Sequence, residues 1–308
     1  MWNNKKEKKK KMKKQAWKSA LMVMAMIFSL ASCVRQGEKK PVIAVSIPPQ
    51  KWLLEKIVGE RYEVVSLLSG GSNPETYEPD MNHLISLERS TAYFCIGNIG
   101  FEMAIVDKAR TNNPSIEICN VSQGIALMRG THQGIALQHS GQSNSDECDP
   151  HVWTSVANAR VMAKNMCQAV SRLDARHARQ YERNLAQLLK QLDELDAELR
   201  QRLSACRGKA FVVWHPSLSY FAADYGLQQI GMEYEGKEMP AKVLKEEIDY
   251  ARACNAKVFF FQKGFDSRQV AAVNNQIGAR LVNINLMNYD WDKELLHIAN
   301  ALREAENN

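Results

Sequence analysis

The sequence predicts a two-lobed α/β protein, in which each lobe is a mostly parallel four-stranded sheet flanked by helices and one long rigid helix joins the lobes. Short β-branched and aromatic runs alternate with helical patterns, and four such runs fall on each side of an unbroken helical stretch. Strands that alternate with helices build parallel sheets from βαβ units. If the first 32 residues are a leader, as argued below, 276 residues remain, a length that predicts about two domains.

Eight runs are candidate strands because they are short and rich in β-branched or aromatic residues. Those before the helical stretch are 42–47, 62–68, 92–96 and 116–121, and those after it are 210–214, 228–231, 257–261 and 280–284.

The long helix is predicted by apolar residues that recur from Tyr181 to Leu203 at spacings of three and four. Asp174 is a candidate N-cap, and Gly208 lies where a glycine beyond a helix end belongs. A helix over 175–205 would be about 46 Å long. It is either a coiled-coil seam or a strut along the protein's own lobes. We favour a strut and a monomer, because so short a seam between α/β units rarely needs a partner strand. A stiff strut would limit closure to small tilts.

The first 40 residues predict a lipoprotein signal peptide and a tether. Residues 1–18 carry nine lysines and one acidic residue, and the 14 residues 19–32 carry no charge. This apolar stretch is shorter than the roughly 20 residues that span a bilayer, so it indicates a secretory leader rather than a membrane span. The boundary Leu30-Ala31-Ser32-Cys33 resembles a bacterial lipobox, which implies cleavage before Cys33 and lipid on its side chain. The alternative is an uncleaved amphipathic anchor.

Removal of the leader changes the charge of the chain. The whole sequence has 40 basic and 34 acidic residues, for a net charge of +6. The leader holds nine of the basic residues and one of the acidic ones, which leaves 31 against 33 and a net charge of −2. The mature chain shows no Lys/Arg-rich patch, so nucleic acid is excluded as a partner. A hydrophobic content of 45% excludes a disordered chain.

These features predict an order of segments along the chain. We expect the signal peptide at 1–32, the tether at 33–40, the N-terminal lobe at 41–173 with a mobile loop at about 122–149, the inter-lobe helix at 174–207 and the C-terminal lobe at 208–308.

Polar residues beyond candidate strands predict a metal site. Glu75, His215 and Asn285 each follow a strand, and His151 lies in Asp149-Pro150-His151-Val152-Trp153. Ligands of open α/β sheets bind beyond the carboxyl ends of strands, and two imidazoles with a carboxylate suit zinc. A single histidine after a strand is more often a surface or capping residue, so only the set is informative. The chain has no nucleophile elbow, phosphate loop or H-E-x-x-H motif.

Three motifs carry a family resemblance: Asn73-Pro74-x-x-Tyr77-Glu78-Pro79, Asp149-Pro150-His151-Val152-Trp153, and Trp214-His215 followed by Tyr220-Phe221 and Tyr225-Gly226-Leu227. From about Pro41 to its end, the chain resembles the metal-binding receptors of bacterial ABC importers for zinc, manganese or iron. The resemblance implies two lobes joined by a rigid helix, with the metal held between them and delivered to a membrane permease. Zn²⁺ is the expected metal, with Mn²⁺ or Fe²⁺ as alternatives.

The resemblance implies the ligands Glu75, His151, His215 and Asn285, with two departures. The family usually has His in place of Glu75 and Asp in place of Asn285, and often Glu near Gln262. A carboxylate still ligates, whereas Asn285 offers only a neutral carbonyl oxygen. Glu75, two neutral histidines and a divalent ion carry a net charge of +1, as do three histidines, one aspartate and the ion. Our hypothesis is that the two substitutions compensate each other.

Trp153, Trp214 and Gln262 are candidates for residues that surround the ligands. Both tryptophans flank a histidine and would keep the site dry, or they are ordinary core aromatics; the two interpretations have similar weight. Three further acidic residues form a second acidic patch or, as we favour, are loop and helix-start charges: Glu233, Glu235 and Glu238.

The segment between Ser122 and Asp149 shows little periodicity and contains His132 and His139. It is either a metal-gathering loop or, as we favour, a plain surface loop. Six cysteines remain beyond Cys33, and disulfides are allowed outside the cytosol. Spacing does not choose among the pairings, and several are expected to be buried small hydrophobes. They are Cys95, Cys119, Cys148, Cys167, Cys206 and Cys254.

Three functions compete at this point. The leading one is a non-catalytic lipoprotein receptor for zinc, held on the membrane by lipid on Cys33 and exposed to the periplasm or the cell exterior. A zinc-dependent hydrolase would use the same two histidines and glutamate. An adhesion lipoprotein with a decayed metal site would explain Glu75 and Asn285. Stoichiometric metal without hydrolytic activity would single out the receptor.

Overall fold

The structure is a computed structural model that describes residues 40–69, 77, 80–129, 148–234, 237–262 and 267–307. The predicted leader, Cys33, Glu75 and the loop histidines His132 and His139 lie outside the described residues. What the sequence predicts for them stays a prediction.

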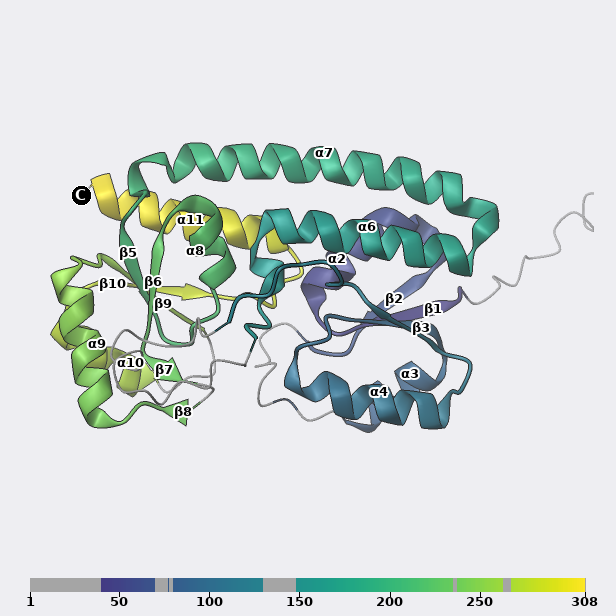
Figure 1. Ribbon diagram of the computed structural model, residues 1–308, viewed down its shortest axis with the longest axis horizontal. Coiled ribbons are helices and arrows are strands. Elements are labelled where there is room, and N and C mark those ends of the chain that lie inside the picture. Colours follow the sequence, from purple (N-terminus) through teal and green to yellow (C-terminus); the bar gives the residue numbers. More distant parts are fainter. Residues whose placement is uncertain are drawn as a thin grey trace, which may run out of the picture. The chain divides into compact units, whose positions relative to one another are not determined.

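Two parallel four-stranded sheets carry the fold, as the sequence predicts (Figure 1). The sheet of the N-terminal lobe pairs its strands in the order β2-β1-β3-β4, and that of the C-terminal lobe in the order β10-β9-β5-β6. The strands are β1 (Val42–Val45), β2 (Glu63–Ser66), β3 (Ser90–Cys95), β4 (Glu117–Asn120), β5 (Ala210–Val213), β6 (Gln228–Gly231), β9 (Val258–Gln262) and β10 (Arg280–Ile284). All eight candidate strands are therefore confirmed, to within two residues at each end.

Both sheets have the same topology. Within each lobe the second strand pairs with the first, the first with the third, and the third with the fourth, and every pairing is parallel. The chain therefore reverses its direction of winding between the first and third strands of each sheet, which are β1 and β3 in one lobe and β5 and β9 in the other. Ligands of open α/β sheets bind at this point, beyond the carboxyl ends of the strands.

Helices cover both faces of each sheet (Figure 1). In the N-terminal lobe α2 (Pro48–Val58) and α6 (Val156–Leu173) lie on one side, and α3 (Met81–Glu88) and α4 (Gly100–Asn112) on the other. In the C-terminal lobe the helices are α8 (Ser219–Tyr225), α11 (Trp291–Asn307), α9 (Ala241–Ala253) and α10 (Ser267–Ile277). Burial on both faces explains why β1 and β5 are apolar at every position.

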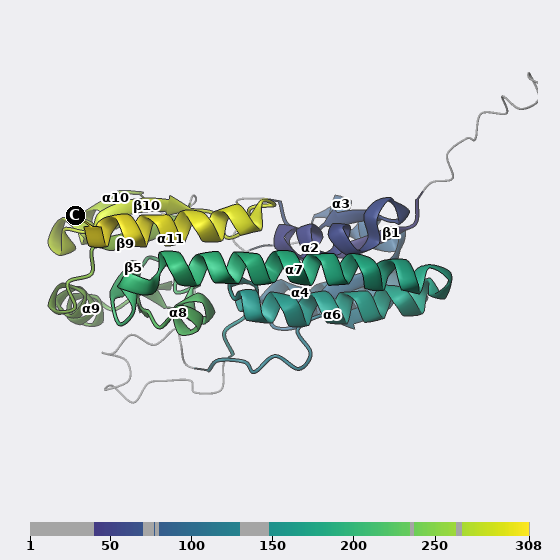
Figure 2. The same cartoon turned by 90° about the horizontal axis from the view of Figure 1, so that it is seen from above.

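The long helix is α7 (Ala178–Arg202), and it lies along both lobes (Figure 2). It packs on α2 and α6 of the N-terminal lobe and on α11 of the C-terminal lobe. Asn184 donates a hydrogen bond to the Ile57 carbonyl oxygen at 2.8 Å, and Asp196 accepts one from the Tyr225 hydroxyl at 3.0 Å. Its leucine seam is thus buried within the chain, as the strut interpretation requires.

The helix is shorter than the sequence predicts. It begins at Ala178 because Asp174 ends α6 and a 3₁₀ turn, Ala175–His177, follows. The Asp174 carboxylate bonds the His177 ring and the Tyr181 hydroxyl, at 2.6 and 2.7 Å, instead of capping a helix. At 1.5 Å per residue the helix is about 37 Å long. Gly208, at φ +76°, follows a second 3₁₀ turn (Ser204–Cys206) and does not end α7.

A single buried apolar cluster extends from Ile43 in β1 to Ala305 in α11, and therefore through both lobes. Trp52 of α2 packs against Trp291 of α11 with ring centroids 5.5 Å apart. The indole N–H of Trp291 donates to the Trp153 carbonyl oxygen at 2.8 Å. Because the lobes share one core, large closing movements would expose buried apolar surface.

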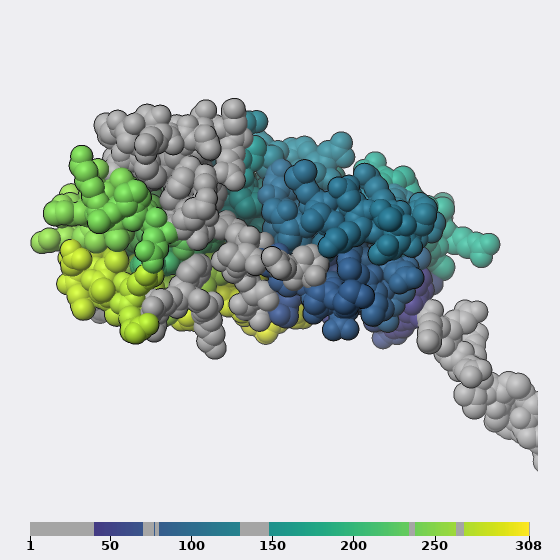
Figure 3. All heavy atoms as spheres, turned by 90° about the horizontal axis from the view of Figure 1, so that it is seen from below, coloured from purple at the N-terminus to yellow at the C-terminus, as the bar shows by residue number. Residues whose placement is uncertain are grey.

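A second apolar cluster lies in the C-terminal lobe, and α9 and α10 cover it. Figure 3 views the side opposite α7, where α3 and α4 cover the N-terminal lobe and α9 and α10 the C-terminal lobe. A short antiparallel ribbon that the sequence did not predict, β7 (Glu233–Tyr234) with β8 (Lys237–Glu238), follows β6.

All six cysteines beyond the leader are described, and no disulfide joins any two of them. Burial raises the pKa of the Cys95 and Cys119 thiols to about 12. Neither of these two thiols is therefore suited to act as a thiolate nucleophile. Within the described ranges, no helix is both long and apolar enough to cross a bilayer.

Candidate metal site

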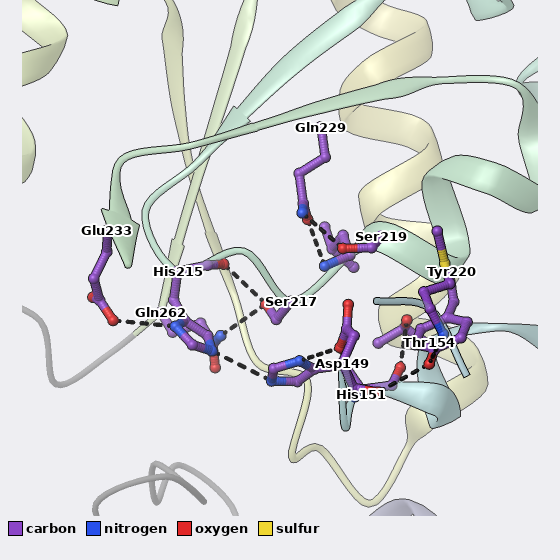
Figure 4. Close-up of polar contacts among 12 residues, drawn as sticks. Asp149, His151, Thr154, His215, Ser217, Ser219, Tyr220, Gln229, Glu233 and Gln262 are labelled. Atoms are coloured by element: carbon purple, nitrogen blue, oxygen red, sulfur yellow. Dashed lines mark hydrogen bonds and ion pairs between the residues drawn. The ribbon is translucent and has the colours of Figure 1, made fainter. Parts of the chain in front are cut away.

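Two of the predicted ligands, His151 and His215, face each other in the folded chain (Figure 4). They are 64 residues apart in sequence, yet their Nε2 atoms lie 3.3 Å apart. The two residues are only 2% and 5% exposed. The fold therefore brings two imidazole nitrogens to one buried point.

The Asp149-Pro150-His151 turn fixes the first imidazole. One carboxylate oxygen of Asp149 accepts a hydrogen bond from the backbone N–H of His151 at 2.9 Å and lies 2.8 Å from its Nδ1. The Tyr220 hydroxyl donates to the Asp149 carbonyl oxygen at 2.9 Å, and Thr154 donates to that of His151 at 2.9 Å. Hydrogen bonds from neighbouring residues thus hold both the backbone and the side chain of His151 in place.

Strand β5 positions the second imidazole, because His215 lies just beyond its carboxyl end. The backbone N–H and hydroxyl of Ser217 donate to the His215 carbonyl oxygen at 2.8 and 3.1 Å. Glu233, the first residue of β7, places Oε1 3.2 Å from Nδ1 of His215. Gln262 at the end of β9 donates to the Ser217 hydroxyl at 3.4 Å (Figure 4).

The two carboxylates indicate how each imidazole could present a nitrogen to a cation. An ionised carboxylate only accepts hydrogen bonds, so a carboxylate beside Nδ1 favours the tautomer that carries its proton there. In that tautomer each Nε2 can donate its lone pair to a cation, in place of the contact between the two Nε2 atoms at 3.3 Å. Asp149 and Glu233 are 0% and 4% exposed. Two buried carboxylates so close together favour a cation at this point.

The spacing of the imidazoles matches the geometry of zinc. Two nitrogens at the usual 2.0–2.1 Å from a tetrahedral zinc ion are separated by about 3.3–3.4 Å. The Nε2 atoms of His151 and His215 lie at that separation. A carboxylate that binds the distal nitrogen of a metal-ligating histidine is the usual outer partner in zinc sites. The four residues together could hold half of the coordination sphere of one divalent ion.

The other two predicted ligands are Glu75 and Asn285. Within the described ranges, no three His, Cys, Asp or Glu side chains are arranged to hold a metal. Glu75 lies outside those ranges. The amide oxygen of Asn285, beyond β10, accepts a hydrogen bond from the Met287 backbone N–H at 3.1 Å, and the Asn285 backbone N–H donates to Glu294 at 2.8 Å. The Asn285 side chain thus stabilises the turn that follows β10.

The two tryptophans beside the histidines have different surroundings. The Trp153 ring lies 5.1 Å from the His151 ring, and its N–H donates to the Leu286 carbonyl oxygen at 3.2 Å. Trp214 stacks on Phe259 in the second apolar cluster of the C-terminal lobe, at an interplanar angle of 15°. Trp153 is therefore the one that adjoins an imidazole, and Trp214 is a core aromatic.

The corresponding point of the N-terminal lobe holds a buried carboxylate. Glu102, in the first turn of α4, accepts hydrogen bonds from the backbone N–H groups of Ile96 and Gly97 at 2.8 and 2.6 Å and from the Ser46 hydroxyl. The Tyr93 hydroxyl lies 2.7 Å from that of Ser46. Burial raises the pKa of Glu102. This network joins the ends of β1 and β3.

Sequence reasoning missed the roles of Asp149 and Glu233. In the sequence, Asp149 stands out only as part of a motif, although its position two residues before His151 allows the two side chains to meet in a tight turn. Glu233 resembles a loop charge in the sequence, because its contact with His215 depends on how β6 and β7 pass the end of β5. Its polarity near the carboxyl end of β6 is the signal that could have indicated it.

Comparison with known proteins decides the family. The family described as the periplasmic component A of the zinc-uptake complex, ZnuA, matches residues 43–300. The chain belongs to the ZnuA family. The resemblance to metal receptors of ABC importers that the sequence motifs indicate is thereby confirmed.

Individual members of the ZnuA family match over most of the chain. A crystal structure of ZnuA is 34% identical with a TM-score of 0.78, and the match covers 86% of this chain and 98% of that one. A ZnuA deletion mutant described with zinc bound matches equally well. The high-affinity zinc uptake protein ZnuA of Bacillus subtilis is 23% identical over 288 residues, 88% of each chain.

The same fold occurs in a more distant receptor. FpvC of Pseudomonas aeruginosa, described in complex with Ni²⁺, is 21% identical with a TM-score of 0.72, over 88% of this chain and 98% of that one. At this identity the likeness shows the fold alone.

Proposed function

We propose that this protein captures a divalent transition metal, zinc, between its lobes outside the cytoplasm and delivers it to an ABC permease. The observation that carries the proposal is the pair of Nε2 atoms 3.3 Å apart, each on an imidazole whose Nδ1 faces a buried carboxylate. Membership of the ZnuA family and the zinc-bound relative support the choice of metal.

Glu75 completes the ligand set in this proposal, with Asn285 or water in the fourth position. Glu75 belongs to the segment after β2, and the carboxyl ends of N-terminal strands are where that lobe would contribute a ligand. Lipid on Cys33 holds the mature protein at the membrane, and the protein works as a monomer. The sequence motifs support these last two statements.

The geometry suits capture better than hydrolysis. A zinc hydrolase needs an open coordination position and a base that activates the bound water. The Asp149 and Glu233 carboxylates lie against the Nδ1 atoms of the imidazoles, so neither is oriented as that base. The side chains of the site are at most 5% exposed, which suits a small ion better than a larger substrate.

Metal analysis of the mature protein tests the proposal. We expect the protein, stripped with a chelator and then dialysed against equal concentrations of zinc and manganese, to retain one zinc ion per chain. Two imidazoles favour zinc, which lies above manganese in the affinity order of nitrogen ligands. Elemental analysis gives the stoichiometry, and ester and peptide substrates test for hydrolysis. Absence of bound metal contradicts the receptor, and metal-dependent hydrolysis would favour the enzyme.

The two departures from the family pattern are expected to differ in their effects. Glu75→Gln should lower zinc affinity by at least about 100-fold, more than the roughly 10–100-fold typical of outer partners. Asn285→Ala should lower it by less than about tenfold, because the Asn285 amide oxygen already bonds Met287. Competition with a chromophoric chelator measures both. Asn283→Ala, an exposed change two residues earlier, is the control. Equal losses would contradict the ranking.

A further inference from the structure

Glu233 is a buried carboxylate that belongs to none of the family motifs. It is 4% exposed and stands at the start of the β7–β8 ribbon. Its Oε1 lies 3.2 Å from Nδ1 of His215 (Figure 4). Burial of a carboxylate lowers the stability of a protein unless the carboxylate is paired or hydrogen-bonded. The partner of Glu233 is the imidazole of His215, a proposed metal ligand.

The backbone brings Glu233 to His215 through a close approach of two segments. The Met232 backbone N–H donates to the carbonyl oxygens of Val213 and Trp214, at 3.0 and 3.1 Å. A Cβ atom on Gly231 would lie 3.1 Å from Cβ of Pro216, so a side chain at this position would press the segments apart. The turn after β5 and the start of β7 are thus held in register, and this register aims Glu233 at His215.

The two imidazoles obtain their carboxylates in different ways. Asp149 is two residues from His151 and forms a local turn with it. Glu233 is 18 residues from His215 and reaches it only through the packing of β6 and β7 beside β5. Loss of Glu233 should therefore affect one imidazole and leave the other in place.

Glu233 also places a carboxylate next to the proposed ligand set. A carboxylate on the distal nitrogen raises the basicity of a histidine ligand and fixes its tautomer. The negative charge of Glu233 lies one imidazole away from the metal position instead of in contact with it.

We propose that Glu233 is a positioning residue for zinc: through its contact with Nδ1, it holds His215 in the tautomer that presents Nε2 to the metal. This inference rests on the proposed function as a metal receptor. The contact itself concerns the metal-free protein, so it is testable separately.

The first measurement is the tautomer of His215 in metal-free protein. ¹⁵N-labelled histidine side chains are observed by long-range ¹H–¹⁵N NMR at about pH 8, where histidine is ordinarily neutral, and His215→Asn identifies the His215 signals. We expect the Nδ1–H tautomer in the wild type and in Glu233→Gln, whose amide oxygen still accepts. Glu233→Ala should shift His215 toward the Nε2–H tautomer, while His151 keeps its own. Gly231→Ala should shift His215 in the same direction without removing any charge.

The second measurement is zinc affinity by chelator competition. Glu233→Ala should lose about 10–100-fold, and Glu233→Gln an intermediate amount, because it keeps the hydrogen bond and loses the charge. Glu238→Gln is the matched control, since Glu238 faces Glu233 across the ribbon but is exposed; it should match the wild type.

The outcomes separate the two proposals. If Glu233→Ala leaves the His215 tautomer unchanged and binds zinc within threefold of Glu238→Gln, the role of Glu233 is refuted. A lower melting temperature with an unchanged tautomer would show a purely structural role and also refute it. If the wild type binds no zinc, the proposed function fails, while the tautomer measurement still decides whether Glu233 positions His215.

Discussion

Replacement of His215 by alanine is expected to lower zinc affinity by about 1,000-fold, equivalent to about 4 kcal/mol. The change removes one of two imidazole nitrogens that lie 3.3 Å apart, at the spacing of a tetrahedral zinc ion. The remaining ligands would have to bind the ion with water in place of His215. Competition against chelators of graded affinity measures a loss of this size.

His297→Ala is the matched control for His215→Ala. His297 is in the same lobe, on α11, and its ring bonds the Asn283 carbonyl oxygen at 3.2 Å near the surface. Its replacement removes a histidine without touching the site, so zinc affinity should stay within a factor of two or so of the wild type. A similar loss in both variants would mean that the affinity loss does not arise from the proposed site.

His215→Ala also has an expected effect on the metal-free protein. It leaves the Glu233 carboxylate buried without the imidazole against which it lies. A buried hydrogen-bond acceptor that loses its partner lowers the stability of a protein by about 1–3 kcal/mol, and by more when the acceptor is charged. The double variant His215→Ala with Glu233→Ala should therefore be more stable toward urea than His215→Ala alone. The order would reverse if Glu233 were stabilised mainly by other contacts.

The fold could be predicted because it depends on local patterns. The strands 228–231 and 280–284 are bounded in the structure as the sequence predicts. The start of α7 could not be predicted in the same way. Aspartate is a residue type that often caps helices, which makes Asp174 a candidate N-cap. In the structure, however, its carboxylate bonds the His177 ring and the Tyr181 hydroxyl in a tight turn between two antiparallel helices. Tertiary packing of α6 on α7 decides that choice.

The candidate site was only partly predictable for a similar reason. His151 and His215 follow the rule that ligands lie beyond the carboxyl ends of strands, and the structure brings them together. Their carboxylate partners required knowledge of a local turn at Asp149 and of a contact over 18 residues at Glu233. Sequence position alone gives Glu233, Glu235 and Glu238 equal weight, whereas burial separates Glu233 from Glu238.

Replacement of Trp291 by alanine is expected to lower the free energy of unfolding by about 3–5 kcal/mol, the range for a large aromatic lost from a core. Trp291 is 3% exposed and joins the lobes: its ring packs on Trp52 of α2, and its N–H donates to the Trp153 carbonyl oxygen. Trp291→Phe keeps most of the apolar surface and loses the hydrogen bond, so it should cost about 1–3 kcal/mol less than alanine. Urea unfolding of the metal-free protein measures both variants.

Tyr289→Phe is the control, because it removes a hydrogen bond between the lobes at the surface. The Tyr289 hydroxyl bonds Glu55 at 2.6 Å, but the side chain is 44% exposed, so its loss should cost less than about 1 kcal/mol. Trp291→Ala should destabilise the protein more than His215→Ala does, and His215→Ala should lose more zinc affinity. If Trp291→Ala instead abolished zinc binding while the protein remained folded, the shared core would hold the ligands in place as well as the lobes. His151, which adjoins Trp153, would then depend on the contact between Trp52 and Trp291 for its orientation.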